Sequence, residues 1–355
     1  MLEIDQPKAV RTGEDLPLAP LNSYLLENGL EEVQTIKQFS GGYSNLTYLL
    51  EAPSTSYVLR KPPKGAKDIK GGHDMAREFG ILKALEKANF KQIPQPLALC
   101  ENESIIGSVF YVMGKVNGSI LRATDAKSFL KTDNSALFRS LSETICLNQV
   151  ALHAIDIQKT GLINIGKPEG YVERQVKGWH KRYLASQTDD VPAMIEVANW
   201  LEDNIPVTTE NTLIHNDYKY DNMILNPENP KEILAILDWE MTTVGDPLMD
   251  LGTSLAYWCQ WTDNDFNKAF NLSWLPGNFT RKEYADLYAK ESGRDISNII
   301  FYYVFGLFKN AVIIQQIYDR YEKGLTKDPR FASLIEGLKV LSSGAKKSIA
   351  SNEMM

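Results

Sequence analysis

Short runs of hydrophobic residues over residues 33–62 predict a β meander. The runs VQTIKQF, LTYLLEA and SYVLRKP are separated by Gly, Ser, Asn and Pro, which favour turns. Residues 74–89 then change to helical spacing, with Phe79, Leu82 and Leu85 recurring on one face and Asp74 placed to cap the first turn. Two more strands are expected in QPLALCEN and SVFYVMGKV. The first third of the chain therefore predicts the order β-β-β-α-β-β.

The segment GKVNGS, residues 114–119, is a Gly-rich break at which we expect a hinge. Beyond it the pattern is mostly helical, with short strands expected only within 212–240. The fold class is thus α+β, with an extended lead-in at 1–32, a small β-rich lobe at 33–117 and a larger, mainly helical lobe at 118–355. Helices are expected at 136–155, 171–186, 192–204, 247–260, 281–291 and 297–322.

Composition narrows the function classes. A net charge of −7 argues against a general nucleic-acid binder, which is more often basic. We see no uncharged apolar stretch long enough for a membrane span and no apolar core of a signal peptide. The three cysteines, Cys100, Cys146 and Cys259, lie too far apart for a metal knuckle and suggest a reducing, cytoplasmic location. A chain of 355 residues is expected to form two lobes or domains.

A polar cluster between two apolar runs, LIHNDYKYDNMIL, holds the most informative residues. Asp217 precedes Asn222 by five positions, and Asp238 ends an apolar run further on. Magnesium takes oxygen ligands, often one or two protein groups together with substrate phosphates. Asn222 and Asp238 could supply such oxygens, while Asp217 could orient the hydroxyl of an acceptor. The alternative for each carboxylate alone is a loop Asp that caps a turn.

The turn FSGGYSN is a candidate phosphate loop. Gly41 and Gly42 allow backbone N–H groups to approach a ligand, with Ser44 and Asn45 beside them. A plain hairpin turn explains the adjacent glycines equally well.

The strand YVLRKPP is the second candidate nucleotide contact. Val58 and Arg60 should share one face, because the side-chain period of a strand is two, and Lys61 should face the other way. Val58 could pack on a flat ring while Arg60 reaches phosphate oxygens, and Glu78 of the following helix could pair with Arg60. We also place Met113, at the start of the hinge, against the nucleotide. The alternatives are an edge strand with solvated cations and a surface glutamate.

HNDYKYDN matches the H-x-D-x-x-x-x-N pattern of the aminoglycoside phosphotransferase and choline kinase-like families, which resemble protein kinases in fold. The stretches FSGGYSN, YVLR, FYVMGKVNG, ILDWE and GDPLMDLG fall where that family has its phosphate loop, strand-three cation, hinge, metal Asp and following helix. The longer stretches FSGGYSNLTYLL, YVLRKPP and ILDWEMTTVGDPLMDLG resemble the kinase-like domains fused to some acyl-CoA dehydrogenases more closely still.

The resemblance implies a two-lobe, protein-kinase-like fold that binds ATP and Mg²⁺. It implies Asp217 as the catalytic Asp, and Asn222 and Asp238 as the residues that hold magnesium. Arg60 stands where protein kinases have Lys, and DWE replaces D-F-G, so activation-segment switching is not expected.

Neighbouring polar residues are expected to support this loop. His215 is interpreted as packing and orienting it, and Asp221 as a salt-bridge or capping residue. Asp246 and Asp250 open a helix, where carboxylates meet free N–H groups, and are interpreted as a scaffold for the catalytic loop.

The acceptor is the least defined part of the prediction. Arg174, Lys177 and Lys181 share a helical face that would suit an anionic acceptor, although a charge stripe is usually a solvated face. The nearly apolar helix at 297–322 is expected in the core and could also wall a site for an acyl-type alcohol. We therefore expect a small-molecule kinase. The alternatives are a non-catalytic nucleotide-binding module and an aminoglycoside O-phosphotransferase, and GTP in place of ATP stays open.

Overall fold

The computed structural model describes residues 6–39, 45–63, 73–207, 210–326 and 329–355. The chain divides into two compact units. Unit 1 comprises Met1–Ile120, Gln158–Ile165 and Asn222–Thr242, and unit 2 comprises Leu121–Ile157, Gly166–Asp221 and Thr243–Met355. Unit 1 carries an antiparallel sheet and unit 2 is mainly helical, as the hydrophobic pattern predicts. The boundary that the sequence suggests between residues 117 and 118 stays a prediction.

A five-stranded antiparallel sheet forms the centre of unit 1, in the order β1-β2-β3-β5-β4. The register places Val58 of β3 opposite Met113 of β5, and Thr47 of β2 opposite Arg60. The strand order follows the predicted meander. The strands are β1 Thr35–Gln38, β2 Leu46–Glu51, β3 Ser56–Lys61, β4 Pro96–Cys100 and β5 Phe110–Gly114.

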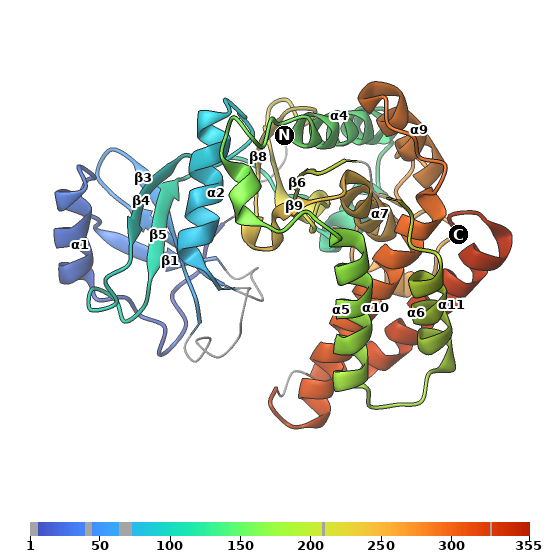
Figure 1. The fold of residues 1–355 in the computed structure, drawn as a ribbon. Coiled ribbons are helices and arrows are strands. Elements are labelled where there is room, and N and C mark those ends of the chain that lie inside the picture. Colours follow the sequence, from blue (N-terminus) through green and yellow to red (C-terminus); the bar gives the residue numbers. More distant parts are fainter. Residues whose placement is uncertain (1–5, 40–44, 64–72, 208–209, 327–328) are drawn as a thin grey trace. The chain divides into compact units, whose positions relative to one another are not determined.

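Two helices cover the two faces of this sheet, α1 (Leu18–Glu27) and α2 (Met75–Lys87) (Figure 1). Leu21 and Leu25 of α1 are fully buried in a cluster with alternate residues of the strands. Asp74 caps α2 by accepting a hydrogen bond from the Arg77 N–H, as predicted. Because side chains alternate between faces, successive residues of β3 point either to α1 or to α2.

The segment after β5 runs beside a short hairpin in the same unit. The hairpin consists of β7 (Met223–Leu225) and β8 (Ile233–Ile236). Ser119 exchanges backbone hydrogen bonds with Leu225. A Cβ on Gly118 would collide with Ile224, so this approach requires glycine. The predicted hinge residues are therefore packed against the hairpin. Unit 1 also contains the 3₁₀ turns η3 (Leu162–Ile165) and η5 (Trp239–Met241).

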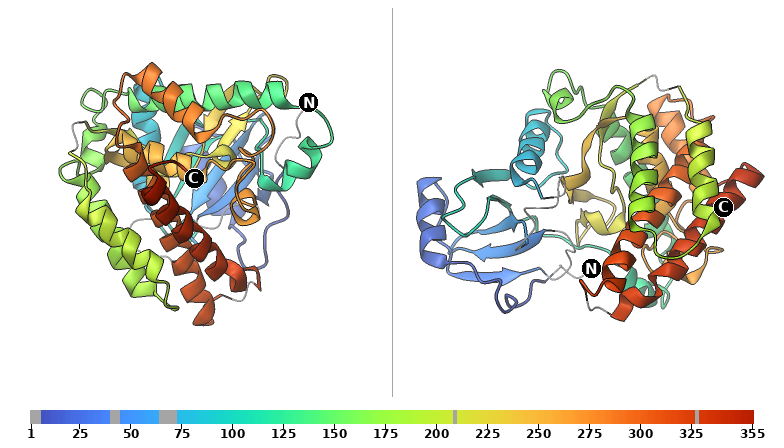
Figure 2. Two further views of the ribbon diagram at one scale, coloured as in Figure 1. Left: turned by 90° about the vertical axis from the view of Figure 1, so that its right-hand side faces the viewer. Right: turned by 60° about the horizontal axis from the view of Figure 1, so that its bottom comes forward.

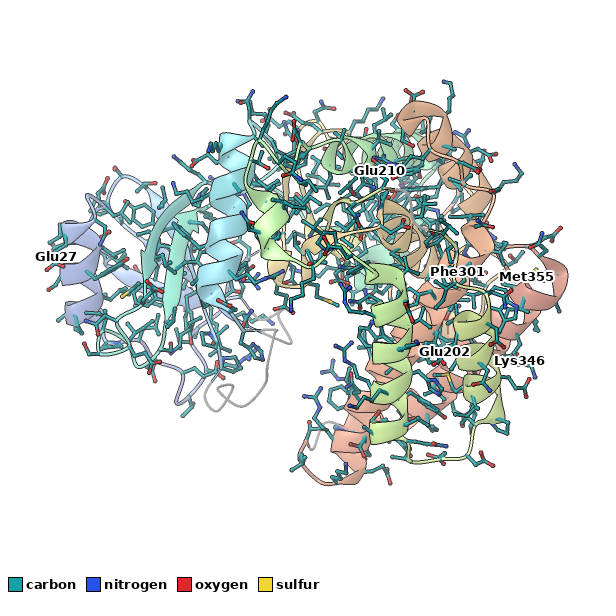
Figure 3. The ribbon with its side chains drawn as sticks, in the orientation of Figure 1. Glu27, Glu202, Glu210, Phe301, Lys346 and Met355 are labelled. Carbon is teal, nitrogen blue, oxygen red and sulfur yellow. The ribbon has the colours of Figure 1, made fainter. Side chains whose placement is uncertain are left out.

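Helix α10 (Ile299–Glu322) forms the core of unit 2, and α5, α6 and α11 lie beside it (Figure 2). Phe301 of α10, labelled in Figure 3, packs against Trp200 of α6 with 6.2 Å between ring centroids. The short ladder β6 (Thr212–Ile214) with β9 (Thr243–Gly245) completes the unit. The other helices are α3 Ala126–Phe129, α4 Ser135–His153, α5 Tyr171–Ser186, α6 Pro192–Asp203, α7 Pro247–Tyr257, α8 Asp265–Lys268, α9 Arg281–Ser292 and α11 Leu334–Ser351, with 3₁₀ turns η2 Ala123–Asp125, η4 Tyr220–Asn222 and η6 Pro329–Ser333.

Helices α7 and α10 approach each other closely because both have a glycine at the contact. A Cβ on Gly252 would collide with the Tyr302 carbonyl group, and a Cβ on Gly306 would collide with the Gly252 carbonyl oxygen and with Ala256. Among the described helices, α10 alone is long and apolar enough to cross a membrane, but 78% of its most apolar stretch is buried inside the protein. It packs here as a core helix, as predicted.

Four of the described α-helices were missing from the sequence prediction: α1, α11 and the short helices α3 and α8. Residues 6–17 lead into the fold without a helix, and Lys8 pairs with Gln38 of β1. Helix α1 then begins at Leu18, within the stretch predicted as an extended lead-in, and that part of the prediction is wrong. Helix α11, near the C-terminal end, was not predicted at all.

Candidate active site

Arg60 on β3 is the centre of an ionic cluster in unit 1. Only 9% of its surface is exposed. Its Nη2 lies 3.4 Å from Oε1 of Glu78 on α2 and 3.1 Å from Oδ1 of Asp238, which follows β8. A third carboxylate, Glu240, lies 3.9 Å away. The predicted pairing of Arg60 with Glu78 is confirmed, and the candidate metal ligand Asp238 belongs to the same cluster.

Burial dominates the electrostatics of this cluster. Burial alone would lower the pKa of Arg60, but Glu78, Tyr111 and Asp238 raise it well above its usual value. Burial also raises the pKa of Glu78, and Arg60 opposes that shift. One guanidinium lies among three carboxylates here. Because the carboxylates outnumber the cation, the cluster would attract an additional positive charge.

Asn222 and Asp238 are neighbours through the backbone. The Leu237 N–H donates to the Asn222 carbonyl oxygen at 2.8 Å. Asp238 adopts a left-handed conformation with φ of 67°, which is uncommon outside glycine and tends to occur at functional sites. An amide oxygen and a carboxylate suit Mg²⁺, which keeps several waters and substrate oxygens. Within the described residues, no group of three or more His, Cys, Asp or Glu side chains is arranged to hold a metal ion. The residues present therefore fit magnesium better than a metal bound wholly by protein.

The candidate phosphate loop can be followed only at its end, because Gly41, Gly42 and Ser44 lie outside the described residues. Asn45 Nδ2 donates to Glu240 Oε2 at 2.8 Å, which places Asn45 beside the Arg60 cluster.

Val58 and Met113 face each other across β3 and β5 and are both largely buried, with 8% and 5% exposed. Lys61 Nζ donates to the Ile106 carbonyl oxygen, and Ile106 belongs to the core on the α1 side. The prediction that Arg60 and Lys61 point to opposite faces is confirmed.

Arg77 is a supporting residue that the sequence prediction missed. Its guanidinium donates to the carbonyl oxygens of Glu240 at 3.3 Å and of Thr242, and also to that of Ile165 at 3.3 Å. It thereby fixes the backbone immediately after Asp238. The only feature of the sequence that pointed to Arg77 was its position one residue before Glu78 in α2.

Asp217 belongs to unit 2, in the loop after β6. Its Oδ2 lies 3.3 Å from Lys219 Nζ, and the Tyr257 hydroxyl donates to the carboxylate. The Asp217 N–H donates to His215 Nδ1 at 3.2 Å. His215 is fully buried with its ring edge-to-face against Tyr218. The expectation that His215 packs and orients the loop is confirmed.

Asp250 on α7 holds this loop by accepting hydrogen bonds from its backbone. Its carboxylate accepts from the N–H groups of His215 at 3.0 Å and Asn216 at 2.6 Å, and from His153 Nε2 at 2.9 Å. Burial alone would raise the pKa of Asp250, but the hydrogen bond and charge of His153 and the charge of His215 lower it to about 2. The predicted scaffold role of Asp250 is confirmed. His153, on α4, was not identified from the sequence.

The other predicted supporting carboxylates also have partners. Asp246 caps α7 by accepting from the Leu248 N–H at 2.7 Å, and the Tyr302 hydroxyl donates to it at 2.9 Å. Asp221 lies 3.8 Å from Lys219, and burial raises its pKa.

The basic face of α5 is exposed, with Arg174, Lys177 and Lys181 all at the surface. Lys177 is exposed and pairs with Glu173 at 2.6 Å. Arg174 donates to two nearby backbone carbonyl groups. Trp179 and Tyr183 of the same helix are buried.

Sequence comparison identifies the family. Residues 35–287 match the model of the phosphotransferase enzyme family. The chain is 37% identical over 312 residues to rat acyl-CoA dehydrogenase family member 11, covering 86% of this chain and 39% of that protein. It is 34% identical over 332 residues to mouse acyl-CoA dehydrogenase family member 10, covering 90% and 30%. The chain thus spans less than half the length of these relatives.

Comparison with solved structures supports the same family assignment. A Ralstonia eutropha protein described as a candidate aminoglycoside phosphotransferase superposes with a TM-score of 0.78 and 29% identity, covering 94% of this chain and 99% of that one. Choline kinase from Cryptosporidium parvum gives a TM-score of 0.62 at 13% identity, covering 90% and 91%, and supports the fold alone. The predicted protein-kinase-like fold and the resemblance to these families are confirmed. The chain belongs to the phosphotransferase enzyme family.

Proposed function

We propose that the chain transfers the γ-phosphate of ATP to a hydroxyl group of a small molecule in the presence of Mg²⁺. The observation that carries this proposal is the cluster of buried Arg60 and Glu78 with half-buried Asp238, where the Asn222 carbonyl oxygen accepts from the backbone N–H next to Asp238.

Each residue of the site has a separate role in the proposed reaction. Arg60 binds phosphate oxygens, and Glu78 holds its guanidinium in place. Asn222 and Asp238 would hold Mg²⁺, which neutralises charge on the phosphates when bound. Asp217 orients the acceptor hydroxyl and accepts its proton. The acceptor oxygen bonds to the γ-phosphorus while the bond from that phosphorus to the bridging oxygen breaks and ADP leaves.

We propose an acyl-type alcohol, such as a hydroxyacyl thioester, as the first acceptor class to test. The support is that relatives over most of this chain are named as acyl-CoA dehydrogenases and contain this region within a longer protein. An aminoglycoside acceptor is the second candidate, favoured by the likeness to the Ralstonia protein.

The direct experiment is an acceptor screen read by mass spectrometry. Pools of hydroxyacyl thioesters, simple alcohols including choline, and aminoglycosides would be incubated with the protein, ATP and Mg²⁺. A mass gain of one phosphate group on one pool, lost when Mg²⁺ is chelated, supports the proposal and names the class. No transfer to any pool, with no hydrolysis of ATP, would favour a non-catalytic nucleotide-binding module.

A further inference from the structure

Lys309 interrupts the apolar core helix of unit 2. Between Ile299 and Tyr318 it is the only charged residue of α10. Its side chain is buried, with 2% of its surface exposed, and its Nζ donates to the Asn216 carbonyl oxygen at 2.6 Å. A core ammonium is costly to bury, so its presence needs an explanation beyond packing.

The residue that Lys309 holds is the one before Asp217. Asn216 has a φ of 67°, a left-handed conformation that must be stabilised by its surroundings. Its N–H donates to Asp250 Oδ1 at 2.6 Å, and its side-chain amide donates to the Tyr171 hydroxyl at 3.3 Å. The carbonyl group, held by Lys309, belongs to the peptide plane that continues into Asp217. The backbone N–H and the carbonyl group of Asn216 are thus both held by ionic side chains.

The close crossing of α7 and α10 brings these two ionic side chains to the same loop. Gly252 and Gly306 allow the helices to approach, Asp250 lies two residues before Gly252, and Lys309 lies one helical turn after Gly306.

We propose that Lys309 is a positioning residue for phosphoryl transfer: through the Asn216 carbonyl oxygen its ammonium fixes the backbone from which Asp217 projects, and it places positive charge near the Asp217 carboxylate. This inference rests on the proposed phosphotransferase function. It adds a residue, far away in the sequence, to the Asp217 loop.

A neutral donor could satisfy one carbonyl group without a buried charge, and α10 contains such a case. Gln315, also buried, donates to the Ser186 carbonyl oxygen at 2.6 Å. The charge of Lys309 is therefore the feature to explain, and Asp217 and Asp250 are the carboxylates that interact with it electrostatically.

The charges around Lys309 are of both signs. Burial lowers the pKa of Lys309 to about 8, while Asp217 and Asp250 raise it and Lys219 and Arg182 lower it further. The ammonium form therefore predominates at neutral pH and is lost as the pH rises through about 8.

The test compares Lys309→Met with Gln315→Met, two variants that each remove one buried donor to a backbone carbonyl group from the same helix. The readouts are steady-state ATP turnover with Mg²⁺ and hydrogen–deuterium exchange of the peptide covering 213–225. For Lys309→Met we expect kcat to fall about tenfold to a hundredfold with little change in KM for ATP, because a misplaced catalytic group slows the chemical step. Exchange in the loop should become faster. Gln315→Met should change neither.

A second variant separates the hydrogen bond from the charge and covers the case in which Lys309→Met does not fold. Lys309→Gln carries no charge but keeps an N–H donor, one bond shorter than the lysine side chain, so we expect a loop that exchanges more slowly than in Lys309→Met and a reduced kcat. In the wild-type protein kcat should decline as the pH rises through about 8, and this decline should be absent in Lys309→Gln.

Three outcomes would overturn the role of Lys309. The first is an unchanged kcat in both Lys309 variants. The second is an equal loss of kcat in Lys309→Met and Gln315→Met. The third is an unchanged rate of hydrogen–deuterium exchange in the loop of Lys309→Met. A wild-type protein without any ATP turnover would instead contradict the proposed function itself, and the positioning role with it.

Discussion

Arg60 Nη2 lies 3.1 Å from Asp238 Oδ1, so the cation assigned to the phosphates and the carboxylate assigned to the metal are in direct contact. The same guanidinium balances Glu78, whose side chain is 2% exposed. Arg60 therefore has a structural task as well as the proposed nucleotide-binding task. Its loss should affect both stability and nucleotide use.

Arg60→Met should destabilise unit 1 strongly, because it leaves the Glu78 carboxylate buried without its cation, with hydrogen bonds from Tyr111 and the Trp239 backbone as its remaining partners. Removing one member of a buried pair costs about 3–5 kcal/mol. Lys37→Met is the matched control, since Lys37 of β1 pairs with Glu51 at 2.9 Å at the surface, where both side chains are half-buried and ion pairs contribute about 0–1 kcal/mol. Urea unfolding measures both. Equal costs for the two variants would contradict the burial argument.

Asp238→Asn should weaken nucleotide binding only when Mg²⁺ is present. The amide keeps the shape of the side chain but loses the charge that a divalent cation requires. We expect the Mg²⁺ concentration for half-maximal ATP binding to rise at least about tenfold, equivalent to about 1.4 kcal/mol. Titration calorimetry with and without Mg²⁺ checks this, with the exposed Asp286→Asn as the control. An unchanged Mg²⁺ requirement would remove Asp238 from the metal site.

Asp250→Asn should destabilise unit 2 at neutral pH and remove part of its acid sensitivity. The pKa of Asp250 is lowered to about 2 in the folded protein, against about 3.9 in an unfolded chain. A lowered pKa means stabilisation that is present above about pH 4 and is lost as the pH falls toward about 2. The difference in unfolding free energy between wild type and Asp250→Asn should therefore shrink over that interval. A difference that stays constant down to about pH 2 would contradict the assignment.

Gly306→Ala should destabilise the α7–α10 crossing by about 1–3 kcal/mol, because the added methyl group collides with the Gly252 carbonyl oxygen. Gly178→Ala on α5 is the control, since a Cβ there meets nothing within 4 Å. It should stabilise the protein by about 0.5–1 kcal/mol. Thermal unfolding distinguishes the two signs. Stabilisation by both substitutions would show that the crossing tolerates a side chain.

The sequence predicted best where periodicity and capping agree. Helix α2 was predicted with its Asp74 cap, and α5 with its full range, because each has a clear apolar face. Helix α1 was missed although Leu18, Leu21 and Leu25 have helical spacing. Pro17 and Pro20 stand at its start, where proline is tolerated because the N–H groups of a first turn have no helical partner.

Side-chain partners across long sequence separations were harder to predict. The pairing of Arg60 with Glu78 followed from strand alternation and from the position of Glu78 near a helix start. The contact of Lys309 with Asn216 could not be predicted in this way, because a lone lysine in an apolar helix gives no indication of its partner. The charge itself was the available signal, since burying an unpaired ammonium is unfavourable.

The binding role of the basic stripe of α5 stays a prediction. Arg174, Lys177 and Lys181 are spaced as a face, and the sequence alone could not tell a binding face from a solvated one. The structure pairs Lys177 with its own helix neighbour and buries the aromatic residues on the other side.

The most direct test of the central claim compares wild type with Asp217→Asn in one assay. Transfer of phosphate from ATP to the acceptor found in the screen is measured by mass spectrometry, and ATP·Mg²⁺ binding is measured by calorimetry on the same samples. The account predicts that Asp217→Asn binds ATP·Mg²⁺ as wild type does and loses about 10² to 10⁴ in kcat, because only proton acceptance and orientation of the hydroxyl are removed. Full kcat in Asp217→Asn would contradict the account and would favour a nucleotide-binding module without catalysis at this loop.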